Sequence, residues 1–256
     1  MITVNTNTAA ISSVITGSQG FAKSGAGTLL LTGTNVYTGS TRINTGVLYI
    51  TSDVNLGQAG AGLTFNGGTL RSTNDIVLNN HPITASTGAT FSNEPASSLT
   101  IPGGMIGGQA LTKNGAGALL LTGTNTIGTT THRLGTLTFA GVSNGLGAVN
   151  IYGGTTGATL NLNGFTTVSG NNIQAGNTSG DRAMVNITTN VTTTNKLLVG
   201  YAGGSAGAVI QNGGSVIIGS GLGGTDYLSM SMNGSAYGYY RINGGQLITG
   251  QLGIKG

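Results

Sequence analysis

Apolar and polar residues alternate along most of the chain, in short runs that end at Gly or Asn-Gly. Period-two alternation with many Val, Ile, Leu and Thr residues is typical of β-strands, whose side chains point in turn to the two faces of a sheet. Clear examples are GTLLLTG (27–33), AGLTFNGGTLRS (61–72), ATLNLNG (158–164), AVIQNGGSVIIG (208–219) and YYRINGGQLITG (239–250). The pattern therefore predicts an all-β fold.

Residues that favour helices are scarce. The 256 residues include 49 Gly and one Glu, Glu94. Because each Gly inside a helix costs about 1 kcal/mol relative to Ala, we expect little or no α-helix.

Internal repetition separates two β architectures, an antiparallel sandwich or barrel and a solenoid of stacked coils. KSGAGTLLLTGTN (23–35) recurs further along the chain as KNGAGALLLTGTN (113–125), with eleven of thirteen positions identical. The turn Asn-Gly-Gly also recurs, at 66–68, 212–214 and 243–245. Units that cannot bury an apolar face alone must stack on their neighbours, so repetition favours the solenoid, with about ten to twelve coils at ~20–25 residues per coil.

The stretch from Lys23 to Leu48 resembles the passenger-associated, or autotransporter-associated, β-strand repeat. The matching residues are KSGAGTL (23–29), GTNVYTGST (33–41) and GVL (46–48), in a family pattern that runs roughly tK-x-G-x-G-T-L-x-L-x-G-x-N-x-Y-x-G-x-T-x-I-x-x-G-x-L. The copy from Lys113 to Leu137 is degenerate, with Ile127 at the Tyr position and Thr129 at a Gly position. LTFNGGTL (63–70) resembles the segment that commonly follows the repeat.

This resemblance implies a right-handed parallel β-helix that forms a stalk or an adhesive surface and carries no catalytic residues. Such repeats occur in bacterial autotransporter passengers and in some phage structural proteins. We expect a single β-helix domain over residues 1–256, with repeats near 21–50 and 111–139 and more degenerate coils over 140–256.

Charge is sparse, with 5% charged residues and a formal net charge of +4. The basic residues form no run that would follow a phosphate backbone, so we expect no nucleic-acid binding. No apolar run approaches the ~20 residues of a membrane-spanning helix, so we expect no membrane insertion. The first residues show no export signal, since the first Lys is Lys23. The nine basic residues are Lys23, Arg42, Arg71, Lys113, Arg133, Arg182, Lys196, Arg241 and Lys255.

A polysaccharide-degrading β-helix is one alternative function. Asp53, Asp75 and Glu94 recur at intervals close to one coil each, so they are predicted to stack on one face near the 4.8 Å strand spacing, which is about the rise from coil to coil. That separation would suit a retaining glycosidase, whose carboxyl groups lie about 5–5.5 Å apart. The competing interpretation, which we favour, is that all three are solvated turn residues.

Nucleophile, metal and calcium sites have weaker support. His81 and His132 are far apart in the chain, neither has an orienting acid in a recognisable sequence context, and the chain has no Cys, so neither a catalytic triad nor a zinc site is expected. Residues 221–228, GLGGTDYL, partly match the calcium-binding nonapeptide, with Leu222 at a Gly position and only one copy present. No cofactor is expected.

Tyr237, Tyr239, Tyr240 and Arg241 form the clearest candidate contact surface. Exposed Tyr beside Arg stacks on sugar rings or forms a hot spot for a protein partner. The alternative, which we favour, is a coil corner where Tyr rings cap the core.

The sequence thus favours a non-enzymatic structural protein on an exterior surface. Because the chain has neither an export signal nor a membrane barrel, we expect a phage virion component, such as a capsid decoration (cement) protein or a fibre or spike segment. It would assemble as a homo-oligomer, with a trimer favoured, and contact other virion or cell-surface proteins and glycans. The alternative is an excerpt of an autotransporter adhesin passenger at the bacterial cell surface.

Overall fold

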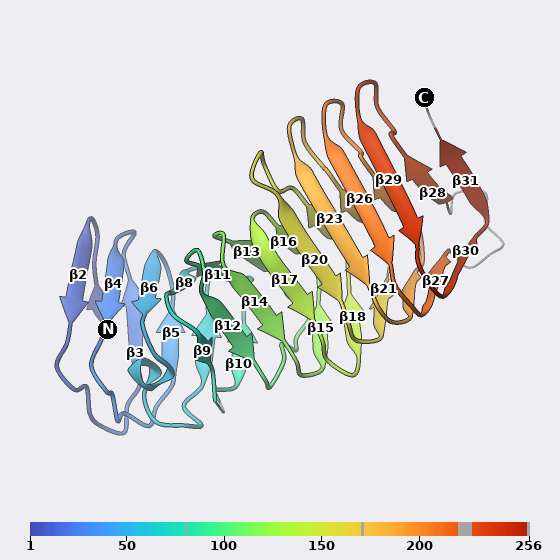
Figure 1. Ribbon diagram of the computed structural model, residues 1–256. Coiled ribbons are helices and arrows are strands. Elements are labelled where there is room, and N and C mark those ends of the chain that lie inside the picture. The colour runs from blue at the N-terminus through green and yellow to red at the C-terminus, as the bar shows by residue number, and fades with distance from the viewer. Residues whose placement is uncertain (80, 170–171, 220–226, 255–256) are drawn as a thin grey trace.

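The chain winds into a rod of stacked coils, with the N-terminus at one end and the C-terminus at the other (Figure 1). This computed structural model describes residues 1–79, 81–169, 172–219 and 227–254. Each coil runs through short strands that turn at Gly-rich corners. The described strands form four sheets, of five, twelve, eight and six strands, named sheets A to D below.

Sheet A contains β1 (Ile2–Thr3), β3 (Phe21–Ser24), β5 (Thr41–Ile43), β7 (Leu63–Phe65) and β10 (Ile83–Ala85). Sheet B contains β2 (Thr8–Ile11), β4 (Thr28–Leu31), β6 (Val47–Ile50), β8 (Thr69–Ser72), β11 (Ala89–Asn93), β13 (Leu111–Asn114), β16 (Thr130–His132), β19 (Val149–Ile151), β22 (Ile173–Ala175), β25 (Leu197–Val199), β28 (Tyr227–Met230) and β31 (Gln251–Ile254).

Sheet C contains β9 (Ile76–Val77), β12 (Ser98–Ile101), β14 (Ala118–Leu121), β17 (Gly135–Phe139), β20 (Ala158–Leu162), β23 (Arg182–Ile187), β26 (Ala206–Gln211) and β29 (Tyr237–Ile242). Sheet D contains β15 (Asn125–Ile127), β18 (Asn144–Leu146), β21 (Thr166–Val168), β24 (Val191–Thr193), β27 (Ser215–Ile218) and β30 (Gln246–Thr249). Within the described ranges the one helical element is a 3-10 turn, η1 (Asp53–Leu56).

Neighbouring strands within each sheet are parallel and are separated by one coil of chain. The length of a coil varies: the step from Thr28 to its partner Val47 is shorter than the step from Asn150 to its partner Gln174. The twelve strands of sheet B define eleven coils. The predicted all-β parallel β-helix is therefore confirmed.

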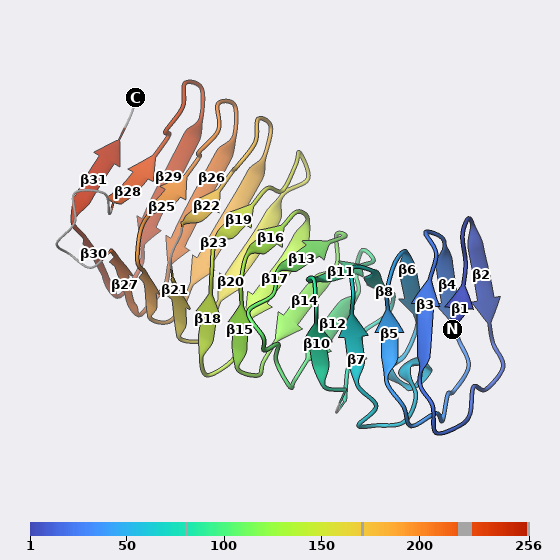
Figure 2. The same cartoon turned by 180° about the vertical axis from the view of Figure 1, so that it is seen from behind.

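Sheets A and D lie in succession along one side of the rod. Figure 2 shows β3, β5, β7 and β10 followed by β15, β18 and β21 on that side. Strands of both sheets directly precede strands of sheet B, as β3 precedes β4 and β15 precedes β16. Residues 102–110 contain no strand and form a bridging segment between the two sheets on this side of the rod. The segment pairs with the coil that contains β15: the Thr126 N–H donates to Met105 O at 2.7 Å and the Gly128 N–H donates to Gln109 O at 2.9 Å.

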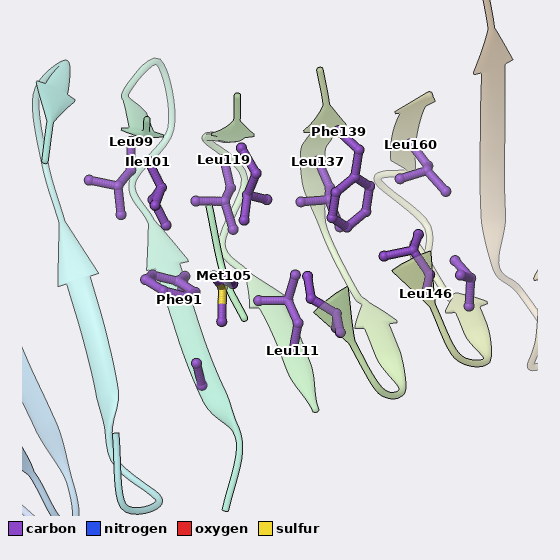
Figure 3. Close-up of a cluster of buried hydrophobic side chains, with 14 of the residues drawn as sticks. Phe91, Leu99, Ile101, Met105, Leu111, Leu119, Leu137, Phe139, Leu146 and Leu160 are labelled. Carbon is purple, nitrogen blue, oxygen red and sulfur yellow. The ribbon is translucent and has the colours of Figure 1, made fainter. Parts of the chain in front are cut away.

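Inward side chains form columns along the axis of the rod. Leu119, Leu137 and Leu160 are in register on successive strands of sheet C, and all three are fully buried. Figure 3 shows them with Phe91 of sheet B and Met105 of the bridging segment in one continuous cluster. Burying a Leu side chain contributes about 1.5–3 kcal/mol, so each coil gains most of its stability from the columns it shares with its neighbours.

Two buried lysines hold the corners of the duplicated motif. Lys23 and Lys113 are 0% exposed. The Lys23 ammonium Nζ donates to the carbonyl oxygens of Ser24, Gly25 and Thr45 at 2.9, 2.7 and 3.1 Å. Lys113 Nζ repeats this arrangement and donates to the carbonyl oxygens of Asn114, Gly115 and Leu134 at 2.8, 2.8 and 3.1 Å. Each lysine therefore ties a turn to the coil that follows.

The asparagine at the other end of the motif links three successive coils. Asn35 accepts a hydrogen bond from the Ile15 N–H at 2.8 Å and donates to Asn55 O at 2.6 Å. Asn125 likewise accepts from a backbone N–H in the preceding coil at 3.0 Å and donates to an amide oxygen in the next coil at 2.7 Å. Because both Asn side chains are almost fully buried, these bonds also satisfy their amide groups.

The two copies of the motif occupy different corners of the rod. The first copy runs from β3 of sheet A into β4 of sheet B, and the second runs from β13 of sheet B into β14 of sheet C. The motif thus encodes a strand, a lysine-braced turn and a second strand. It does not encode the face on which they lie.

Candidate functional site

The predicted tyrosine cluster lies on β29, where strand alternation divides it. Tyr240 is in register with the fully buried Val209 and points inward. Tyr237, Tyr239 and Arg241 point to the opposite, outer face of sheet C. Tyr237 is 64% exposed and Tyr239 is 41% exposed.

Tyr240 closes an inner column of sheet C. Its hydroxyl donates to Gln211 Oε1 at 2.8 Å, and burial raises the pKa of this phenol well above its usual value. Gln211 is itself buried, and its Nε2 donates to Gly214 O and Gln246 O, both at 2.9 Å. This one side chain has the core-capping role that was the alternative interpretation of the whole cluster.

Small side chains separate the outward tyrosines from a further cation, Arg182. Register places Ala206 between Arg182 and Tyr237, and Ala208 between Met184 and Tyr239. The Arg182 side chain is exposed. Sequence reasoning missed Arg182, because it lies far from Tyr237 along the chain and only the stacking of three coils brings them onto one face.

A trough of about 800 Å³ lies where the outer face of sheet C meets the loops before its strands. We call it the sheet C trough, and its lining comprises residues 135–136, 155–159, 180–184, 204, 206–208 and Tyr237. Figure 1 shows the loops before β23, β26 and β29 projecting from the rod. The turns in these loops are alike. Each is closed by a backbone hydrogen bond from an N–H to the carbonyl oxygen three residues earlier: from Asp181 to Thr178, from Ser205 to Ala202 and from Ala236 to Asn233.

Asp181 is the carboxylate in the wall of the trough, and it is committed to the loops. It is 4% exposed. Its Oδ1 accepts from the Gly154 N–H at 3.1 Å, and its Oδ2 accepts from the N–H and hydroxyl of Thr178 at 2.6 and 2.8 Å. This carboxylate therefore ties two neighbouring loops together.

Three other surface cations stack on tyrosines, whereas Arg182 and Arg241 form no ion pair or ring contact within the described part of the chain. The stacked pairs are Arg71 on Tyr49 at 4.8 Å, Arg133 on Tyr152 at 5.2 Å and Lys196 on Tyr227 at 4.7 Å. The guanidinium groups of Arg182 and Arg241 both lie on the outer face of sheet C.

The carboxylates of the hydrolase hypothesis follow consecutive strands of sheet B, yet each has its own partner. Asp53 Oδ1 accepts a hydrogen bond from the Asn79 N–H at 3.2 Å and lies 3.3 Å from His81 Nε2. Asp75 Oδ1 accepts hydrogen bonds from the N–H and the hydroxyl of Ser98 at 2.9 and 2.7 Å. Glu94 Oε1 accepts a hydrogen bond from Arg71 Nε at 2.6 Å. Burial raises the pKa of Asp53, while His81 and the Asn79 N–H oppose that rise. Each of these contacts joins two neighbouring coils.

The two histidines are apart and also have structural contacts. His81 Nδ1 lies 2.7 Å from Ala61 O. His132 is fully buried next to Lys113 in register, and burial, followed by the Lys113 charge, lowers its pKa to about 3. No cluster of three or more His, Cys, Asp or Glu suited to a metal occurs among the described residues. Most of the calcium-like segment 221–228 lies outside them.

Nowhere in the described part of the chain is there a helix with the length and apolar character needed to cross a bilayer.

Comparison with known proteins supports the resemblance found in the sequence. Residues 21–50 match the family model described as Passenger-associated-transport-repeat. Over 115 residues, 45% of this chain, the sequence is 38% identical to a protein named Adhesin BmaC autotransporter from Brucella suis biovar 1 (strain 1330). The chain spans 3% of the length of that protein. No solved structure gives a significant match. The chain therefore carries an autotransporter passenger repeat, built as coils of a parallel β-helix.

Proposed function

We propose that this chain is a segment of an autotransporter passenger that stands on a bacterial cell surface and acts in adhesion. It works through its shape and its outer faces, without catalysis. The observation that carries the proposal is the passenger repeat at residues 21–50, which here forms part of a continuous parallel β-helix. The similarity to a protein named as an autotransporter adhesin supports the same function.

The β-helix is suited to a stalk because its contacts are between neighbouring coils. Each coil stacks on the next through parallel strands and buried columns, and Lys and Asn bonds add to this stacking at the two copies of the repeated motif. Because each coil needs only its neighbours for stability, coils can be added along one axis to make a long stalk without a large globular core. Neither match favours the virion component expected from the sequence, so the alternative function is preferred.

Cell-surface labelling tests this proposal. Antibodies raised against residues 1–256 should label intact cells that express the full-length gene, and protease added to intact cells should remove the label. Deleting the gene should reduce attachment of those cells to host-cell monolayers or matrix-coated surfaces. Labelling that requires permeabilised cells, or that sediments with phage particles, would contradict it. The trimer expected from the sequence stays a prediction, which sedimentation of the purified chain tests.

A further inference from the structure

The outer face of sheet C carries two exposed aromatic rings and two cations that form no ion pair with any described residue, with the small side chains of Ala206 and Ala208 between them. Tyr237 and Tyr239 lie on β29, and Arg241 follows them at the same two-residue spacing. Arg182 lies on β23, two strands away from Tyr237 across Ala206. With strands about 4.8 Å apart, the backbones at Arg182 and Tyr237 are about 9.6 Å apart, comparable with the length of a disaccharide.

We propose that the sheet C trough, together with Tyr239 and Arg241 beside it, binds an extended acidic polysaccharide. Tyrosine rings present an apolar face to the C–H groups of a sugar and a hydroxyl to its polar edge. Guanidinium groups pair with carboxylate or sulfate groups through two parallel hydrogen bonds. The Ala206, Gly207 and Ala208 floor lets a chain approach the sheet closely.

Charge complementarity selects an acidic ligand. The strands of sheet C from β17 to β29 contain no Asp or Glu. Arg182 and Arg241 therefore face the ligand without a competing carboxylate from these strands. Asp181, in the wall, already accepts three hydrogen bonds from the loops.

The sparse charge favours a polysaccharide over a nucleic acid. A nucleic acid carries a phosphate on every nucleotide, and sites that hold it line a continuous cationic groove. This face offers two guanidinium groups, which are too few to line such a groove. Arg182 and Arg241 lie two strands apart across the sheet and four residues apart along it, so an extended polysaccharide with carboxylates spaced along its length can reach both cations across the aromatic rings and small side chains.

Stacking of coils leaves this face accessible. Outward side chains stand roughly perpendicular to the sheet, whereas a neighbouring coil pairs along the edge of a strand. Tyr237, Tyr239 and Arg241 are therefore available whether or not another coil pairs with β29. This inference deepens the proposed function, since an adhesive surface needs a ligand.

Binding by the purified chain tests the inference. The probes are decasaccharides of hyaluronan and polygalacturonate, with a neutral glucan of equal length, oligo(dT) and poly-glutamate as comparisons, all by calorimetry at about 0.15 M salt, where long-range attraction is screened. We expect at least one acidic decasaccharide to bind, and Tyr237→Ala/Tyr239→Ala and Arg182→Gln/Arg241→Gln each to weaken that binding at least tenfold.

Two matched controls lie on other parts of the rod. Arg42→Gln removes an exposed cation from β5 of sheet A, and Phe165→Ala removes an aromatic ring that is 45% exposed before β21. Both should keep the affinity within twofold, and circular dichroism should show that all variants remain folded.

Three outcomes would overturn the inference: no binding of any acidic decasaccharide, equal binding of the glucan, oligo(dT) or poly-glutamate, or equal losses in the control variants. Because the assay needs no cell, a failure here leaves surface display standing, and a failure of cell labelling leaves the binding result standing.

Discussion

Lys113 shows how a charged side chain is accommodated inside this rod. It occupies an inner position, in register with Phe91 of the preceding coil and His132 of the next. Burial lowers the pKa of Lys113 to about 7, and the same cause lowers the pKa of Lys23. Three carbonyl acceptors match the three donors of an ammonium group, so the site is polar although it is closed to solvent.

The lowered pKa of Lys113 predicts a stability that depends on pH. Between its folded pKa of about 7 and an unfolded value of about 10.4, the unfolded chain binds a proton that the folded chain has lost. The free energy of unfolding therefore rises with pH in this window, by at most about 1.4 kcal/mol per pH unit. Lys113→Met should flatten that rise in urea unfolding measured from pH 7 to pH 10.

Lys23→Met provides a second test of the same corner, because the two lysines make equivalent bonds. It should change the pH dependence in the same direction. Parallel curves for the wild-type chain and both variants would show that neither lysine loses its proton on folding.

At the scale of the element, the corners depend on close stacking of one turn on the next. Gly46 follows β5 with a φ of +68° and lies directly over the carbonyl groups of Gly25 and Gly27. A Cβ at Gly46 would lie less than 3.0 Å from both oxygens. Gly60 has a φ of +92°, but a Cβ there would meet nothing within 4 Å.

This pair separates backbone strain from steric overlap. Gly60→Ala should lower the free energy of unfolding by about 1–2 kcal/mol, because a residue with a Cβ disfavours the left-handed backbone and no steric overlap is added. Gly46→Ala should cost at least about 2 kcal/mol more, because the coil must also move away from its neighbour. Chemical denaturation of both variants measures the difference, and equal losses would show that the coils tolerate the added methyl group.

At the scale of the whole molecule, the stability of the rod is approximately the sum of the contributions of its coils and of the contacts between neighbouring coils. Thr112, Thr131 and Asn150 are in register on three successive coils, at equal intervals along the chain. Deleting residues 131–149 therefore removes one complete coil and leaves every remaining side chain on its own face. The shortened chain should unfold cooperatively, with β-rich circular dichroism and protease resistance.

Deleting residues 131–140 is the matched control. It removes only part of a coil, so the following strands reach the wrong faces and the apolar columns are broken. This variant should be sensitive to protease. Equal resistance of the two deletions would contradict a structure that depends on the register of its coils.

The candidate site could be predicted from the sequence only in part. Tyr237, Tyr239, Tyr240 and Arg241 form a cluster that is visible in the sequence, and period-two alternation separates Tyr240 from the other three once β29 is known to be a strand. Arg182 and the loops that wall the trough come from other coils. Their position depends on the accumulated lengths of those coils, which are unequal, as the register pairs of sheet B show.

The sequence by itself determined the strands, the Gly-rich turns and the parallel β-helix, because alternation, turn chemistry and repetition are local properties that each coil repeats. The tertiary structure alone decided which face each turn occupies, so that two nearly identical motifs lie at different corners. It also decided that Lys23 and Lys113 are buried against carbonyl groups. The physical reason is that burial and partners depend on the coils above and below, whose register no local pattern records.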